Sequence, residues 1–181
     1  MSRKVLFISS SLRNPSNSEK LAREVEKGVI ANNDDTEFIS LRDRDIRFCR
    51  GCLACQKTQK CVMEDDAGPI VEKVRDADVL VLATPVYYYG ISGCLKTFLD
   101  RCNPLYPGEY RFREVFLVCT SEEDSPTVAS GAVTAVKGWV ECFPRARFAG
   151  AFSGGGVGTE DLELEKWKDL MNDAFLFGKE I

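Results

Sequence analysis

Four cysteines in a short stretch are the most chemically distinctive feature of the sequence. They follow the spacing Cys49-x2-Cys52-x2-Cys55-x5-Cys61. Four thiolates this close together can wrap a [4Fe-4S] cluster, which takes four cysteine ligands. Zinc also accepts four thiolates, although the two cysteine pairs of a zinc site usually lie further apart in the sequence. The spacing therefore predicts a [4Fe-4S] site, with zinc or metal-free thiols as the alternatives.

The rest of the composition narrows the chemistry further. The chain has 181 residues, eight cysteines and no histidine. The lack of histidine excludes histidine general-base catalysis, Ser-His triads and histidine metal sites. In a reducing compartment, clustered cysteines are more often metal ligands or redox groups than disulfides. The four cysteines outside the run have no such spacing, and we expect them to be structural: Cys94, Cys102, Cys119 and Cys142.

A second candidate site is the hydroxyl-rich segment Ser9–Ser18, which follows an apolar run and precedes a helix-like segment. It contains neither GxGxxG nor GxxxxGK[ST], which argues against a dinucleotide fingerprint and a P-loop. Free N–H groups and the positive end of the helix dipole would favour a phosphate here, and Arg13 could add a charge-assisted hydrogen bond. The alternative is plain helix capping, with Ser16 as N-cap and Glu19 three residues later.

A third candidate site is Thr84–Gly93, at the end of another apolar run. Its three adjacent tyrosines, Tyr87–Tyr89, offer flat apolar faces with polar tips, which suits a planar ring system. Pro85 and Gly90 favour a turn whose backbone groups can face a ligand, and Ser92 can cap the next helix. The alternative is that the tyrosines contact another subunit.

These segments need a scaffold that brings them together. Near-continuous apolar runs predict parallel strands buried on both faces, at Lys4–Ser9, Thr36–Leu41, Asp78–Thr84, Glu114–Thr120 and Arg147–Phe152. Helix candidates lie between or after them, near 17–31, 67–76, 92–102, 126–142 and 160–178. The alternation predicts a single α/β domain over residues 1–181, a doubly wound sandwich with its binding crevice at the carboxyl ends of the strands. The connection at about 42–66, which holds the four-cysteine run, is long enough to suggest a function.

Charge and hydropathy exclude two classes of partner. The net charge is -4 and no basic tract dominates, so nucleic acid is not expected. There is no apolar stretch of about 18 residues, and the apolar run near the start is too short for a signal peptide. We therefore expect no membrane partner and a cytoplasmic location.

Two of these segments resemble a known family. Ser11-x-Arg13 with Asn17-Ser18, and Thr84–Arg101, resemble the NADPH-dependent FMN reductases and iron–sulfur flavoproteins of flavodoxin-like fold. The resemblance covers about the first 120 residues and implies a five-stranded parallel sheet of order 2-1-3-4-5. It implies an FMN whose phosphate is held by Ser11, Arg13, Asn17 and Ser18, beside Ser16. The implied flavin-ring and flanking residues are Thr84, Pro85, Val86, Tyr87, Tyr88, Gly90, Thr120 and Ser121.

The resemblance also implies a flavin-dependent oxidoreductase, with the chemistry at flavin N5 and no catalytic side chain. The cysteine spacing matches that of iron–sulfur flavoproteins, in which a [4Fe-4S] cluster passes electrons to FMN. A ferredoxin or a small molecule would then be the electron donor. Similar cysteine segments also occur in reductases without a cluster, which would make the chain an NAD(P)H-dependent FMN or quinone reductase. A third hypothesis is a thiol-based redox-sensing electron carrier.

Two expectations concern how the cofactors are placed. The family suggests a homodimer or homotetramer with the flavin near the interface. Because the cysteine loop and the flavin loops start from the same sheet edge, we expect the cluster to lie close to FMN. The glycine-rich run Ser153–Gly158 follows the last strand, and we expect it to be a flexible connection bordering the flavin or a subunit contact.

Overall fold

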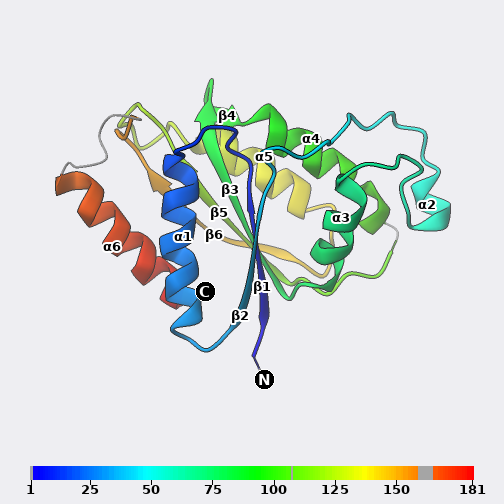
Figure 1. Cartoon of the computed structure of the whole chain (residues 1–181), viewed down its shortest axis with the longest axis horizontal. Coiled ribbons are helices and arrows are strands. Elements are labelled where there is room, and N and C mark those ends of the chain that lie inside the picture. The colour runs from blue at the N-terminus through cyan, green and yellow to red at the C-terminus, as the bar shows by residue number, and fades with distance from the viewer. Residues whose placement is uncertain (1, 107, 159–164) are drawn as a thin grey trace.

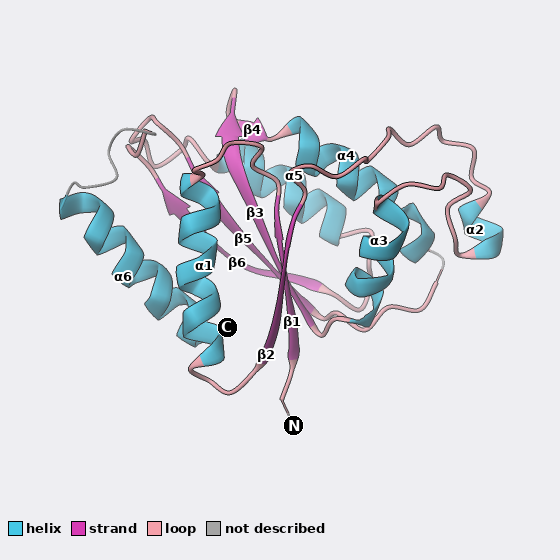
Figure 2. Ribbon diagram, in the orientation of Figure 1, coloured by secondary structure: helices cyan, strands magenta, loops and turns pink. Residues whose placement is uncertain are grey.

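A parallel sheet forms the centre of the molecule in a computed structural model that describes residues 2–106, 108–158 and 165–181. The described strands run in the order β2-β1-β3-β5-β6 (Figure 2). Their bounds are β1 Lys4–Ser9, β2 Asp35–Ser40, β3 Val79–Tyr87, β5 Glu114–Thr120 and β6 Arg147–Gly154. A two-residue strand, β4 Gly90–Ile91, pairs antiparallel with the end of β3. Apart from this short strand, the order is the one expected from the sequence, and the flavodoxin-like fold is confirmed.

Helices cover both faces of the sheet. Helices α1 (Asn17–Ile30) and α6 (Glu165–Glu180) lie on one face, and α3 (Ala67–Asp76), α4 (Gly93–Arg101) and α5 (Ser130–Val140) lie on the other (Figure 1). The short helix η1 (Asn103–Leu105) contacts α3 and α4, and a second short helix, α2 (Cys55–Thr58), contacts η1. The part of the last expected helix at 160–164 is outside the described residues.

The pleat of the strands explains why both faces need covering. In β1, Val5 and Phe7 pack in the core under α1 and α6, while Leu6 and Ile8 pack in the core under α3–α5. Successive strand side chains point to opposite faces, so a strand that is apolar at every position must be buried on both. Helices α1 and α6 approach closely through glycines: a Cβ at Gly178 would lie 2.1 Å from the carbonyl oxygen of Val25.

The connection between β2 and α3 is a long loop that is closed at its base. The Asp45 N–H donates to the Asp66 carboxylate at 2.9 Å, and the Asp66 N–H donates to the Asp45 carbonyl at 3.0 Å. Gly51 takes a positive φ of 63°, a conformation that glycine adopts without strain. Beyond this base the loop runs out past α3 and α4 and contains α2 (Figure 1). No helix of the described ranges is both long enough and apolar enough to cross a membrane.

Candidate functional site

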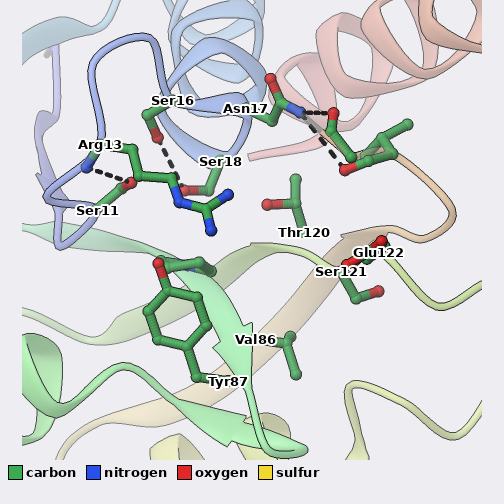
Figure 3. A pocket seen from close by; sticks show the side chains of 13 residues that line it. Ser11, Arg13, Ser16, Asn17, Ser18, Val86, Tyr87, Thr120, Ser121 and Glu122 are labelled. Carbon is green, nitrogen blue, oxygen red and sulfur yellow. Dashed lines mark hydrogen bonds between the residues drawn. The ribbon is translucent and has the colours of Figure 1, made fainter. Parts of the chain in front are cut away.

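The main cavity lies at the carboxyl edge of the sheet, where the sequence predicts a binding crevice. Its volume is about 580 Å³, which is within the range typical of ligand pockets. It is lined by residues that follow β1, β5 and β6 and by the end of β3: Ser11, Arg13, Ser16, Asn17, Ser18, Pro85, Val86, Tyr87, Thr120, Ser121, Glu122, Val157 and Gly158 (Figure 3). Ten of the residues predicted from the sequence are in this set, so the fold brings together segments that are more than 100 positions apart.

One end of this cavity is the start of α1. The Ser16 side chain caps the helix by accepting the Glu19 N–H at 3.2 Å. The second half of the capping box would be a hydrogen bond from the Ser16 backbone N–H to the Glu19 carboxylate. That carboxylate instead pairs with Arg42 at 2.6 Å. The N–H groups of the first helical turn have no partner inside the helix, and the dipole makes this end positive. Both features suit a phosphate group.

Arg13 supplies a full positive charge at the same end. Its backbone N–H donates to Ser11 Oγ at 3.4 Å, and its guanidinium extends into the cavity (Figure 3). Among the described residues, no carboxylate lies within ion-pair distance of this guanidinium, unlike that of Arg42. The Oγ atoms of Ser16 and Ser18 lie 3.3 Å apart on the adjacent wall. A guanidinium, hydroxyls and helix N–H groups therefore face one volume.

Asn17 lines the cavity, as the sequence predicts, and its side chain also makes contacts that the sequence does not predict. Its Nδ2 donates to the carbonyl oxygens of Gly158, at 2.5 Å, and Val157, at 3.4 Å (Figure 3). The amide thus ties the segment after β6 to the start of α1 and closes that side of the cavity. Val157 and Gly158 were not assigned to the site from the sequence. Their signal was the glycine-rich run after the last strand, which was expected to border the flavin.

The opposite wall is formed by the end of β3. Pro85, Val86 and Tyr87 line the cavity, and Pro85 pairs in register with Thr120 at the end of β5. The chain then turns back through Tyr88 and Tyr89, whose φ angles are 49° and 62°. An aliphatic and aromatic wall opposite a polar one is what a planar ring carrying a phosphate tail would need.

Three residues predicted for the ring do not line this cavity. Thr84 is buried, and its Oγ1 accepts the Ser92 N–H at 3.0 Å, which holds the start of α4 against β3. Gly90 lies in β4, and Tyr88 is fully exposed at the tip of the hairpin. The next residue, Tyr89, anchors this hairpin by donating from Oη to the Glu123 carboxylate at 2.6 Å.

The four-cysteine run forms a second, smaller cavity. Cys49, Cys52, Cys55 and Cys61 all line it, together with Asn103. Cys55 is buried, Cys61 is half-buried and the first two are exposed. Burial raises the pKa of the Cys55 thiol, while a hydrogen bond from Asn103 acts in the opposite direction.

The donor set fits a cubane cluster in type and number. Within the described ranges, no three cysteine or carboxylate side chains are arranged to hold one metal ion. A cubane binds each of its four sulfur ligands to a different iron, so its ligands surround a larger volume than the ligands of a single ion. Four soft thiolates around one cavity are therefore compatible with a cluster, although the geometry does not show a preformed site.

The cysteine run does not border the main cavity, because the two cavities share no lining residue among those described. Helix α2 lies at the end of the molecule opposite α6 (Figure 1), whereas the residues that line the main cavity include the start of α1 and the end of β3. The reason is that the loop is held at the C-terminal end of α4, by Arg101 and Asn103. The nine residues of α4 span about 14 Å, and this helix separates the two places.

The remaining cysteines agree with the structural role expected for them only in part. Cys102 and Cys119 are buried in the core, and burial raises the pKa of both thiols. Cys94 is half-buried in the first turn of α4 and packs against the core, and Cys142 is exposed just after α5.

Comparison with known proteins decides the family. The family model of the NADPH-dependent FMN reductases matches residues 3–143. The chain belongs to this family. The match confirms the family resemblance seen in the sequence. It covers the loops after β1, β3 and β5 and the whole cysteine run, but ends before β6 and α6.

Individual relatives agree with this assignment. An iron-sulfur flavoprotein of Methanocaldococcus jannaschii is 40% identical over 105 residues, which are 58% of this chain and 54% of that protein. An iron-sulfur flavoprotein of Archaeoglobus fulgidus is 36% identical over 114 residues, 62% of this chain and 50% of that protein. The chain thus spans about half the length of these relatives. An NAD(P)H:quinone oxidoreductase from Methanothermobacter marburgensis shares the fold, with a TM-score of 0.76 at 15% identity over 99% of this chain and 96% of that one.

Proposed function

We propose that the chain binds one FMN in the main cavity and acts as an FMN-dependent oxidoreductase. The observation that carries this proposal is the division of the cavity into a cationic, hydroxyl-rich end at the start of α1 and an apolar wall at the end of β3. The phosphate would bind at Ser11, Arg13, Ser16 and Ser18, and the ring would lie against Pro85, Val86 and Tyr87. Thr120 and Ser121 would border the ring from the loop after β5.

The protein's own contribution is to bind and orient. Bound FMN supplies the acceptance and release of electrons or hydride at N5, and the chain offers no histidine for proton transfer. Arg13 and the helix start fix the phosphate, so that the ring takes one position along the apolar wall. Asn17 holds the segment after β6 against the cavity and limits the access of water from that side.

The finer proposal concerns the cysteine run. We propose that Cys49, Cys52, Cys55 and Cys61 hold a [4Fe-4S] cluster, and that the chain passes electrons between this cluster and FMN. The shared cavity of the four sulfurs supports it, as do the relatives named iron-sulfur flavoproteins. A ferredoxin or a small one-electron donor would suit this function. We also propose a homodimer or homotetramer, which light scattering of the FMN-loaded protein would test.

The alternative is a cluster-free, NAD(P)H-dependent FMN or quinone reductase. The family description favours it, and so does the position of the cysteine run at the far end of α4, away from the main cavity. In this case the four thiols would have no part in turnover.

Anaerobic reconstitution separates the two. The chain is loaded with FMN, iron and sulfide, and then iron, zinc and released flavin are measured for the wild type and for Cys55→Ser. We expect FMN as the flavin and about four irons per chain, with fewer irons in the variant. Full FMN loading without iron, together with NAD(P)H oxidation, would establish the cluster-free reductase instead. Recovery of FAD in place of FMN would contradict both.

A further inference from the structure

Arg101 is a charged side chain that the FMN cavity does not use. It is the last residue of α4 and is only 2% exposed. A buried arginine is rarely found without a partner. Here the partner is Asp65, whose side chain is also buried, with Nη1–Oδ2 and Nη2–Oδ1 distances of 2.5 and 2.9 Å. Nη1 also donates to the Arg47 carbonyl at 2.8 Å. Contacts from residues before and after the cysteine run therefore hold the guanidinium in one orientation.

This orientation directs one N–H of Arg101 at a cysteine sulfur. Nη2 lies 3.4 Å from Cys61 Sγ. Two residues further along the chain, Asn103 Nδ2 lies 3.2 Å from Cys55 Sγ. Both sulfurs line the same cavity. Among the described residues, Cys49 and Cys52 receive no such side-chain hydrogen bond, so the two donors contact the two less exposed cysteines of the run.

N–H groups directed at sulfur have an electrostatic consequence. A neutral thiol is a weak acceptor, whereas hydrogen bonds to the sulfurs of a metal-bound thiolate are among the factors that set the reduction potential of an iron–sulfur cluster. One-electron reduction adds one negative charge to a cluster. Donors that point at its sulfur ligands, one of them on a cation, stabilise the reduced form more than the oxidised form.

We propose that Arg101 and Asn103 are positioning residues for the cluster: they orient Cys61 and Cys55 and raise the reduction potential of the cluster that these residues help to bind. The inference rests on the proposed [4Fe-4S] site and goes beyond it, since it assigns two residues outside the four-cysteine motif. Asp65 takes part indirectly because it fixes the guanidinium.

The test is an anaerobic potentiometric titration of the reconstituted, FMN-loaded protein. Dithionite supplies the electrons, and the reduced cluster is followed by electron paramagnetic resonance. Asn103→Leu is the main variant, because it removes the donor, nearly keeps the side-chain shape and lies at a partly exposed position. Arg101→Lys keeps the charge but not the forked geometry. Asn172→Leu, at an exposed position on α6, is the matched control.

We expect Asn103→Leu and Arg101→Lys to shift the cluster midpoint to a more negative potential and to change the resonance of the reduced cluster. The FMN midpoint and the control variant should keep wild-type values. Loss of iron from an Asn103→Leu protein that still binds FMN would support the orienting role. If both variants load fully and their cluster potentials equal the wild-type value, the inference is wrong while the cluster proposal stands. If the wild type itself binds no iron, or only zinc, the cluster proposal fails and this inference with it.

Discussion

Replacing Arg13 with alanine is the most direct test of the phosphate site. The guanidinium extends into the main cavity (Figure 3) and has no carboxylate partner among the described residues. Its removal therefore leaves no buried carboxylate uncompensated. A hydrogen bond to a charged group contributes about 1.5–3 kcal/mol. Because Arg13 is exposed to water, we expect the lower part of this range, about 1.5–2 kcal/mol, which corresponds to FMN binding that is weaker by about 10–30-fold.

The assay is quenching of flavin fluorescence on titration of the apoprotein with FMN and, separately, with riboflavin. Riboflavin lacks the phosphate, so its binding should not depend on Arg13. We expect Arg13→Ala to change the Kd for riboflavin by less than about twofold, a small free-energy difference on the scale where 1.4 kcal/mol is tenfold. Arg44→Ala, at an exposed position outside the main cavity, controls for the change in net charge. Added salt should reduce the difference between wild type and variant, because exposed charges are screened. Equal weakening of FMN and riboflavin would show that Arg13 acts through the fold, and the phosphate assignment would be refuted.

Three further predictions concern stability, each measured by urea unfolding. Gly178→Ala should lower the free energy of unfolding by about 1–3 kcal/mol, because the new Cβ would meet the Val25 carbonyl; an unchanged midpoint would contradict the close helix contact. Burial alone would raise the pKa of Asp65, but hydrogen bonds from Arg101 and from backbone N–H groups lower it to about 2. A carboxyl whose folded-state pKa is lowered stabilises the fold above its unfolded-state pKa. The free energy of unfolding of the wild type should therefore exceed that of Asp65→Asn by less and less as the pH falls from about 4 to 2. A gap that stays constant over this pH range would contradict the lowered pKa. Tyr88→Gly should raise the stability of the apoprotein by up to about 1 kcal/mol, since glycine takes a positive φ without strain; a clear loss would show that the ring makes contacts of its own.

The sequence predicts the scaffold more closely than the details of the site. The strands Lys4–Ser9 and Glu114–Thr120 were predicted to the residue, because their apolar runs end abruptly at polar positions. The strand β3 runs past its predicted end at Thr84 to Tyr87. The sequence did not predict this extension, because the two central turn residues of the hairpin are tyrosines at positive φ, where glycine or asparagine is the usual signal.

The same limit applies to the chemistry-bearing side chains. Serines and an arginine before a helix predicted residues that do line one end of the main cavity, because helix starts have a fixed geometry. The Asn17 side chain, by contrast, is taken by carbonyl groups about 140 positions away. Arg101 also escaped notice in the sequence, where it is one of many charged residues near a helix end. Only the fold shows that it is buried, and that the cysteine loop supplies its partner.

The closed base of the cysteine loop has a consequence for how this protein could be altered or could have arisen. Since Asp45 and Asp66 bridge the two ends, the segment between them is a cassette that could be shortened or transplanted without moving β2 or α3. Arg101 sets a condition on that exchange, because excising the loop removes Asp65 and strands a cation in the core, which is strongly destabilising. A viable chimera must therefore replace position 101 together with the loop. A recombination breakpoint between the loop and position 101 should therefore lower the stability of the product.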